Sequence, residues 1–298
     1  MPRRVTTTIA SLATAALAGV ALTSAPATAA PTATTGAPGV PYSCQASLRA
    51  YSSTGSLAWY EYSKGIAKSV RVGKNSLGWQ PTAAQQVGAG GDPTSFFSTE
   101  VATSKGGKLM QIKQNGKFSN GAWSVTQSAT TLRSSGWTGT RALVASYGGY
   151  LYRLHGSTLT RYKQGAWVDG KLTLSGGSRV GTNWGGVRSM VYERTGVVSG
   201  RTIDVFLAND TSGRLVEYRI PRTEPAKWTR TVLRSTGFKS VRALTTSPCG
   251  SSGRAIGAIT DTDTMYVWYD PKVSDLKGGD IRGGWTGKRG FSRAAFGQ

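Results

Sequence analysis

The 298-residue sequence has few acidic residues, one histidine and two cysteines. Its 14 Asp and Glu residues face 36 Lys and Arg residues, a formal net charge of +22, which favours anionic partners over cationic ones. The only histidine, His155, stands in a Leu-His-Gly-Ser turn, and no Gly-x-Ser-x-Gly elbow accompanies it, which argues against a Ser-His-Asp triad. Metal sites need clustered His, Cys or carboxylate residues, and the sequence has no such cluster. We therefore expect no catalytic residue, no metal site and no cofactor.

Long apolar runs and helical periodicity are also missing. No stretch keeps a helical period across ten residues without a Gly interruption, so we expect almost no helix. The run from Ile9 to Leu22 is too short and too rich in Ala and Thr for a membrane span. Arg3 and Arg4 precede this run and Ala27-Thr28-Ala29 follows it, which is typical of a secretory signal. We expect a secreted protein, and the twin-arginine route stays open beside general export.

The two cysteines are Cys44 and Cys249. In an exported protein an even pair indicates one disulfide, with two buried free thiols as the alternative.

One short frame recurs along the chain: an aromatic residue is followed four residues later by Arg and then by a small and an apolar residue. We call each of these aromatics a repeat mark. The four marks are Trp137, Trp184, Phe238 and Trp285, and their arginines are Arg141, Arg188, Arg242 and Arg289. The steps of 47, 54 and 47 residues between the marks suit the blades of a propeller. Between the marks, short apolar or alternating runs broken by Gly, Asn, Asp and Ser pairs indicate strands and turns, as in 141–146, 150–154, 157–162 and 167–174.

The sequence therefore predicts an all-β, five-bladed β-propeller of four-stranded antiparallel blades. The first unit lacks a first strand and takes 79–87 as its fourth, and the second begins at 94–98 with Asp92 where a mark is expected. The C-terminal segment 289–296 has the pattern of a first strand, so it completes the N-terminal blade, closes the ring and removes free sheet edges. Cys44 and Cys249 then meet across this seam. The chain divides into a signal peptide (1–29), a flexible leader (30–42) and a single β-propeller domain (43–298).

The order of motifs resembles the tachylectin family of five-bladed propeller lectins over about residues 43–298. The motifs that carry the resemblance are Trp79 with Val87-Gly88-Ala89-Gly90-Gly91, Ser135-Gly136-Trp137, Val180-Gly181-Thr182-Asn183-Trp184, and Gly149-Tyr150-Leu151-Tyr152. The resemblance implies binding of N-acetylated sugars at several equivalent sites between blades, without catalysis. The Asp-Gly turn common in that family is replaced by pairs such as Ser212-Gly213, and the repeats are unequal in length, so we expect fewer than five working sites.

Two sets of aromatic residues are candidates for sugar contact. We predict that the repeat marks and their arginines form the sites, because indole rings stack on sugars and guanidinium groups donate to ligand oxygens: Trp137, Arg141, Trp184, Arg188, Phe238, Arg242, Trp285 and Arg289. In the alternative, the aromatics are wedged between blades as core, and the arginines stack on Trp or bond to loop carbonyls. A second set, for which we favour a core position, is Trp79, Trp123, Trp167 and Trp228.

These observations predict a monomeric, non-enzymatic lectin whose partners are glycans or anionic polysaccharide, with no membrane span and no nucleic acid. One alternative is a secreted polysaccharide hydrolase or lyase that uses acids such as Glu193 and Asp261. The other is an electrostatic binder of an anionic cell-wall polymer.

Overall fold

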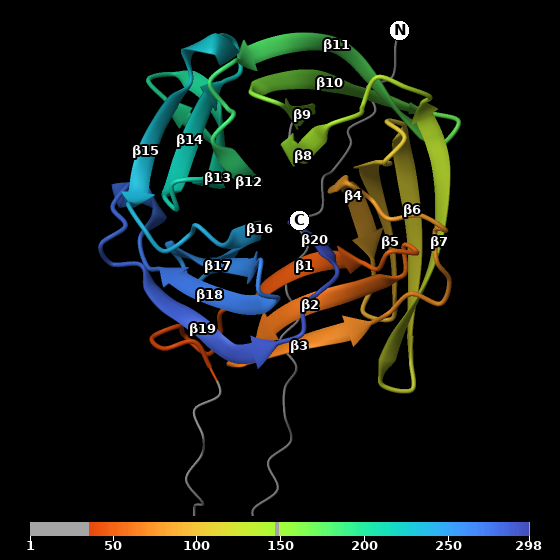
Figure 1. The fold of residues 1–298 in the computed structure, drawn as a ribbon, viewed down its shortest axis with the longest axis horizontal. Helices are drawn as coiled ribbons and strands as arrows, with labels where there is room; N and C mark the ends of the chain where they lie inside the picture. The colour runs from red at the N-terminus through yellow and green to blue at the C-terminus, as the bar shows by residue number, and fades with distance from the viewer. Residues whose placement is uncertain (1–35, 147–148, 298) are drawn as a thin grey trace, which may run out of the picture. The chain divides into compact units, whose positions relative to one another are not determined.

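Strands make up most of the residues that the computed structural model describes, which are 36–146 and 149–297. They form five sheets of four antiparallel strands, arranged as the blades of a propeller, which confirms the predicted fold. In Figure 1 the first strand of each blade lies nearest the middle of the ring and the fourth strand lies outermost. The predicted signal peptide and most of the predicted leader lie outside the described residues.

The blades take the strands in the following order, from the middle outward. Blade 1 has β20 (Ala294–Phe296), β1 (Ala46–Tyr51), β2 (Leu57–Ser63) and β3 (Ile66–Arg71). Blade 2 has β4 (Ala83–Gly91), β5 (Ser95–Thr103), β6 (Leu109–Ser119) and β7 (Ala122–Arg133). Blade 3 has β8 (Thr140–Ser146), β9 (Tyr150–His155), β10 (Thr158–Val168) and β11 (Lys171–Gly181). Blade 4 has β12 (Val187–Val198), β13 (Arg201–Asp210), β14 (Leu215–Pro221) and β15 (Thr229–Arg234). Blade 5 has β16 (Val241–Cys249), β17 (Gly253–Thr260), β18 (Thr264–Asp270) and β19 (Arg282–Arg289).

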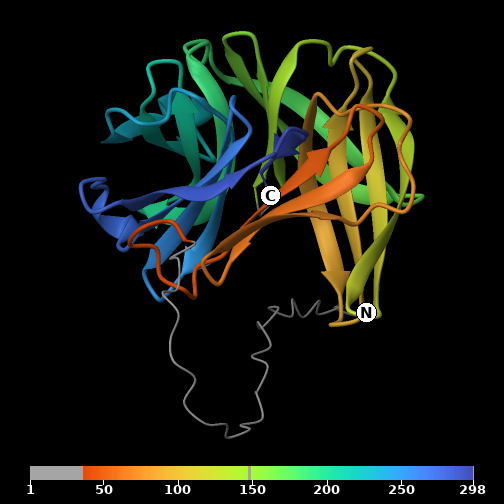
Figure 2. The same ribbon diagram turned by 60° about the horizontal axis from the view of Figure 1, so that its bottom comes forward.

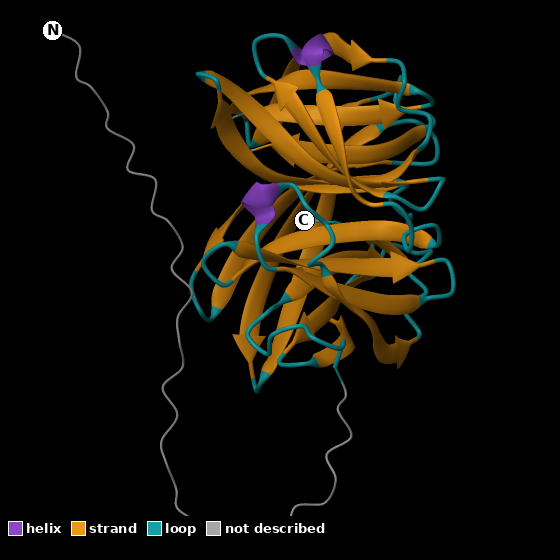
Figure 3. Cartoon of the chain, turned by 90° about the vertical axis from the view of Figure 1, so that its left-hand side faces the viewer, coloured by secondary structure: helices purple, strands orange, loops and turns teal. Residues whose placement is uncertain are grey.

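Helix is nearly absent from this part of the chain, as predicted. Figure 3 shows two short helices, the 3-10 turns η1 (Pro225–Lys227) and η2 (Val273–Asp275). No helix among the described residues has the length and apolar character needed to cross a membrane.

The ring is closed by the C-terminal strand, as the sequence predicted. β20 pairs with β1 in antiparallel register, with Phe296 opposite Arg49 and Ala294 opposite Tyr51. Figure 2 shows the blue C-terminal strand beside the red-orange β1 near the middle of the ring. The inner edge of the N-terminal blade is therefore covered, although the paired segment is shorter than the predicted 289–296.

One backbone hydrogen bond recurs at all five junctions between blades. The residue in the mark position donates its N–H to the carbonyl of the turn between the second and third strands of the preceding blade. The pairs are Trp137 to Gly107, Trp184 to Ser157 and Phe238 to Gly213, each at 3.0 Å, Phe291 to Asp263 at 3.1 Å, and Leu77 to Gly55 at 3.4 Å. We call the side of the ring that carries these junctions the mark side and the other side the opposite side.

This hydrogen bond corrects two of the predicted marks. The mark before blade 1 is Phe291 and not Trp285, which lies within β19. The mark before blade 2 is Leu77, while Asp92 lies in the turn between β4 and β5. The Gly-Trp-Thr-Gly sequence around Trp285 copies an earlier mark, but the ring that blade 1 buries belongs to Phe291, which packs edge-on against Tyr60 with centroids 4.9 Å apart.

Two strand assignments also differ from the prediction. The fourth strand of blade 1 is β3 and not 79–87, and the first strand of blade 2 is β4 and not 94–98. The cause is a two-residue turn at Lys64 and Gly65, which both have positive φ, 51° and 72°. Such a turn returns β2 directly into β3, and Lys-Gly is a weaker sequence signal for it than Asn-Gly.

The hydrophobic core lies between neighbouring blades. Between blades 3 and 4, Tyr152 of β9 packs against Phe206 of β13 with ring centroids 4.8 Å apart. Between blades 4 and 5, Leu207 of β13 belongs to the same buried cluster as Ile256 of β17. Because each cluster draws side chains from two blades, no blade buries its apolar faces alone.

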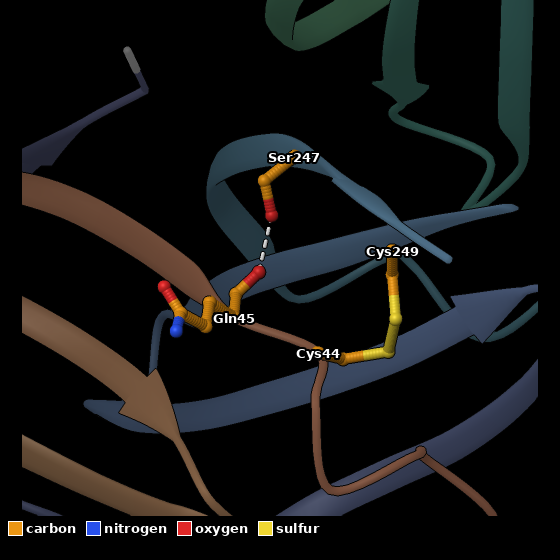
Figure 4. Close-up of a disulfide and its surroundings, with 4 residues drawn as sticks. All are labelled: Cys44, Gln45, Ser247 and Cys249. Atoms are coloured by element: carbon orange, nitrogen blue, oxygen red, sulfur yellow. Dashed lines mark hydrogen bonds between the residues drawn. A yellow bond between two sulfur atoms is a disulfide. The ribbon is translucent and has the colours of Figure 1, made fainter. Parts of the chain in front are cut away.

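The predicted disulfide joins the two blades at the seam. Cys44 precedes β1 and Cys249 ends β16, and their Cα atoms are 5.0 Å apart. Figure 4 shows a hydrogen bond beside the disulfide, from the Ser247 hydroxyl to the Gln45 carbonyl. Ala37 and Val40, which precede Cys44, contact the core between blades 1 and 5.

Removing this disulfide should destabilise the ring. The cysteines are 205 residues apart, so the bond restricts a large part of the unfolded chain. We expect the Cys44→Ser/Cys249→Ser variant to lose about 2–4 kcal/mol of unfolding free energy in urea titrations. The unaltered protein measured in reductant should lose the same amount, and equal stability of all samples would contradict the prediction.

The corrected mark gives a second prediction. Phe291 is buried between strands, so Phe291→Ala should cost about 3–5 kcal/mol of unfolding free energy. Trp285 is 48% exposed, so Trp285→Ala should cost about 1 kcal/mol or less. Urea unfolding followed by circular dichroism compares the two, and the reverse order would restore Trp285 as the mark.

Candidate functional site

Three of the four predicted mark aromatics are buried. Trp137, Trp184 and Phe238 each precede a first strand and lie against an aromatic residue of the third strand of the same blade. The ring centroids are 5.1 Å apart for Trp137 and Tyr162, 4.5 Å for Trp184 and Tyr218, and 4.5 Å for Phe238 and Trp268. This is the wedge arrangement that the sequence left open as the alternative, and it presents no ring face to a sugar.

The arginines that follow these marks bond across the blade junctions. Arg141 donates to the carbonyls of Gly185, at 3.1 Å, and of Val187 in the connection to blade 4. Arg188 donates to the carbonyl of Lys239 and to both carboxylate oxygens of Asp261 at 2.8 Å.

Arg242 repeats the pattern at the seam, where it donates to the carbonyls of Arg293, at 3.0 Å, and of Phe291. It also donates to Asp263 at 2.9 Å. Each guanidinium therefore ties its own blade to the next one, which matches the alternative of arginines bonded to loop carbonyls.

The fourth predicted pair lies elsewhere. Trp285 is in β19 with 48% of its surface exposed, and the Arg289 guanidinium lies 6.0 Å from the centre of its ring. The structure brings these two together on the outer strand of blade 5, and both are accessible to solvent.

The acids required by the hydrolase alternative are engaged in ion pairs. Asp261 is held by Arg188, and Glu193 of β12 is bonded to Arg194 and to Arg254 of β17. His155 ends β9 at the turn into β10, as the sequence predicted. The described residues contain no group of three or more His, Cys, Asp or Glu side chains placed to hold a metal ion.

A buried charge cluster joins blades 4 and 5. The Arg254 guanidinium contacts Glu193, lies 2.8 Å from Asp270 Oδ2 and lies 3.7 Å from Glu217 Oε2. Burial raises the pKa of Glu193 and of Asp270, while the positive charge of Arg254 opposes this rise. Arg254 is therefore the counter-charge that these buried carboxylates share.

Similar polar links cross two other junctions. Arg49 and Tyr51 of β1 both bond Glu100 of β5 between blades 1 and 2, and the Tyr51 hydroxyl is 2.6 Å from Glu100 Oε2. Between blades 3 and 4, the Tyr152 hydroxyl donates to Asp204 Oδ2 at 2.8 Å. These side chains link neighbouring blades at the junctions.

A groove that combines exposed aromatic and polar side chains lies between blades 2 and 3 on the opposite side of the ring. It has a volume of about 460 Å³. Trp167, at the end of β10, and Phe97, at the start of β5, line it with 46% and 57% of their surfaces exposed. The floor includes Gly88 of β4, where a Cβ atom would lie 3.8 Å from Cζ2 of Trp167. The missing side chain leaves the indole accessible from within the groove.

Polar groups stand beside the two rings. Asn115 lies directly across from Phe97, and Lys113 lies across from Thr99, so both project from the same face of blade 2. Lys113 Nζ lies beside the turn at Gly170, 2.8 Å from where a Cβ atom on that glycine would stand. The groove thus offers an amide and an ammonium group within reach of a ligand that rests on the aromatic rings.

A second groove lies at the seam between blades 1 and 5, with a volume of about 320 Å³. Most of the residues that line it are of polar type, including Ser63, Thr245 and Glu61. Tyr62 is the only aromatic residue that lines it, and its ring is buried. This groove therefore lacks an accessible aromatic face.

The sequence indicates Trp167 as a recurring aromatic but does not predict its environment. Trp167 was assigned to the start of a fourth strand, whereas it lies near the end of the third strand, two residues before the turn at Asp169 and Gly170. The segment Gly88-Ala89-Gly90 was noted as part of a repeat motif, and it forms part of β4 beside this groove. Phe97 carries no repeat signal, so the aromatic pair was not predicted.

Comparisons with known proteins give no family assignment. No family model matches the chain. No curated protein matches it.

Several solved structures are similar in fold. AofleA from Arthrobotrys oligospora is 14% identical, with a TM-score of 0.38 over 77% of this chain and 68% of that chain. A mutant of Aleuria aurantia lectin in complex with Fucalpha1-6GlcNAc is 14% identical, with a TM-score of 0.34 over 76% of this chain and 75% of that chain. Trypanosoma rangeli sialidase in complex with sialic acid is 11% identical, with a TM-score of 0.29 over 82% of this chain and 42% of that chain. Similarities this low carry no argument about function.

The charge cluster predicts a pH-dependent loss of stability. Arg254→Met leaves Glu193, Glu217 and Asp270 without their shared counter-charge, which should cost about 3–5 kcal/mol of unfolding free energy near pH 7.5. A carboxyl whose folded pKa lies above its unfolded value stabilises the fold below the unfolded pKa, and this stabilisation is lost as pH rises through the folded pKa. The loss should therefore be smaller at pH 5 than at pH 7.5 in urea titrations. Arg254→Lys, which keeps a charge, should show a weaker pH dependence, and a pH-independent loss for Arg254→Met would refute the account.

Proposed function

We propose that this protein is a non-enzymatic carbohydrate-binding propeller and that its saccharide site is the groove between blades 2 and 3. The observation that carries the proposal is the exposed pair Trp167 and Phe97 in a groove that also holds Lys113 and Asn115. Large exposed aromatic side chains in a concave site are unfavourable in water unless a ligand covers them.

The geometry suits the amphipathic surface of a pyranose ring. The C–H face of a sugar packs on an indole or phenyl face, and its hydroxyl groups point outward from that contact. The Asn115 amide both donates and accepts hydrogen bonds, and the Lys113 ammonium donates them to hydroxyl or carbonyl oxygens. A volume of about 460 Å³ lies in the range of small-molecule sites.

The resemblance to tachylectin-like lectins makes N-acetylated hexosamines the first ligands to test. The sequence predicted several similar sites, but only this groove pairs two exposed aromatics with polar groups among the cavities described above. Trp285 and Arg289 remain the accessible part of the predicted set, and we propose them as a secondary contact for a longer glycan. Affinity for a single sugar is therefore expected to be modest.

We also propose that the protein is exported and that residues 1–29 are removed. The support is the charged, apolar and Ala-x-Ala order of that segment, together with a disulfide of the kind that forms in oxidising compartments. N-terminal sequencing of protein from culture medium tests this, and a start at or close to Ala30 is expected.

The saccharide site is tested by replacing its aromatic platform. We expect Trp167→Ala to weaken binding of the best saccharide on a glycan array at least about tenfold in titration calorimetry, equivalent to about 1.4 kcal/mol. Phe97→Ala should weaken it by a smaller factor, because a phenyl face is smaller than an indole face.

The matched control is Trp285→Ala, which removes an indole of nearly the same exposure outside the groove. A monosaccharide should bind this variant as tightly as the unaltered protein. Unchanged affinity of Trp167→Ala would overturn the proposal. So would release of reducing ends from the bound glycan, if Glu193→Gln abolished that release.

A further inference from the structure

The two sides of the ring differ in charge. On the mark side, each of the five junctions between blades carries an exposed Lys or Arg. This residue lies either in the segment that connects one blade to the next or within the last three residues of the fourth strand before that segment. These residues are Lys74, Arg133, Arg179, Lys239 and Lys288. They come from all five junctions, so positive charge recurs around the ring on this side.

The carboxylates of the mark side are already paired. Asp210 is 2.6 Å from Arg214, Asp261 is 2.8 Å from Arg188, and Asp263 is 2.9 Å from Arg242. Lys74, Lys239 and Lys288 take part in no ion pair with a residue that the structure describes. In turns of the opposite side, Asp92 and Asp169 are exposed, while Glu224 is half-buried and paired with Arg201.

Further arginines lie toward the middle of the mark side, where Arg188 and Arg242 are balanced by Asp261 and Asp263 and Arg141, which bonds backbone carbonyls, adds positive charge. Arg141, Arg188 and Arg242 line a cavity of about 140 Å³ at the inner ends of the blades. Arg153 and Arg293 bond backbone carbonyls at 2.8 Å, which fixes the guanidinium groups but leaves their formal charge intact. These guanidinium groups are thus held in place and need no rearrangement before they meet an anion.

From this arrangement we infer that the mark side binds a flexible phosphodiester polymer that carries no bases. Guanidinium and ammonium groups placed around a ring match the repeated non-bridging oxygens of such a chain, and release of its counterions drives the association. The mark aromatics that would stack on bases are buried, which disfavours single-stranded nucleic acid. This surface is separate from the saccharide groove, which lies on the opposite side.

The test measures binding of a glycerol-phosphate polymer by fluorescence anisotropy at several salt concentrations. The variant Lys74→Glu/Lys239→Glu/Lys288→Glu reverses three exposed charges of the mark side. The control Lys64→Glu/Lys117→Glu/Lys272→Glu reverses three exposed lysines of the opposite side, with the same change of net charge. Circular dichroism and thermal unfolding establish that both variants are folded.

We expect the mark-side variant to bind at least about 30-fold more weakly at 50 mM salt, with a shallower dependence on salt by about 2 in the logarithmic slope, as for three lost phosphate contacts. The control should change binding by less than about threefold. Equal losses in both variants would mean that net charge alone is responsible and would overturn the inference, as would absence of binding to the unaltered protein.

Two competitor polymers test which kind of anionic polymer the mark side prefers. Single-stranded DNA or polygalacturonate that binds more tightly than the glycerol-phosphate polymer, at equal charge and salt, would overturn the assignment to a phosphodiester chain without bases. Trp167→Ala should leave polymer binding unchanged, so failure of the saccharide proposal and failure of this one are distinguishable.

Discussion

The arrangement of blades depends on the contact between each repeat mark and the blade before it. A four-stranded blade is apolar on both faces and cannot bury them unless it packs against two neighbours. The mark residue makes this packing specific, because its backbone N–H bonds the preceding blade while its side chain fills the base of its own blade, as Trp184 does against Tyr218. Leu77 makes the same hydrogen bond without a ring, so the backbone contact is the constant element and the side chain varies.

Polar contacts then distinguish the junctions from one another. An ion pair crosses between blades 1 and 2, a tyrosine–aspartate bond between blades 3 and 4, and a charge cluster between blades 4 and 5. The seam between blades 5 and 1 carries the disulfide instead. The buried partners differ in type and position from one junction to the next. These differences favour packing of each blade against its correct neighbour and disfavour packing of the similar repeats in a wrong order.

The sequence allowed the fold to be predicted but not the groove, and the reason lies in which residues repeat. The step between marks and the first-strand pattern at the C-terminus were sufficient for five blades and a closed ring, because these features are imposed on every unit by the packing. Recurrence is a poor guide to ligand contacts, however. Trp137 and Trp184 recur because the fold buries them, so they are not the sugar contacts that their repetition predicted. Phe97 belongs to blade 2 and Trp167 to blade 3, and only the packing of these two blades brings them to one groove. Trp285 shows that a similar motif need not occupy the same place in the fold. The sequence around it nearly copies an earlier mark, but it lies within β19, and Phe291 is the residue that packs at the mark position of blade 1.

The disulfide also determines what happens when the backbone is cut. Cys44 and Cys249 enclose most of the ring, from the start of β1 to the end of β16. A protease that nicks any single turn between them produces two new chain ends but no separate fragments, because both pieces stay joined through sulfur. Such a nicked molecule keeps its two pieces joined and migrates as one species until it is reduced.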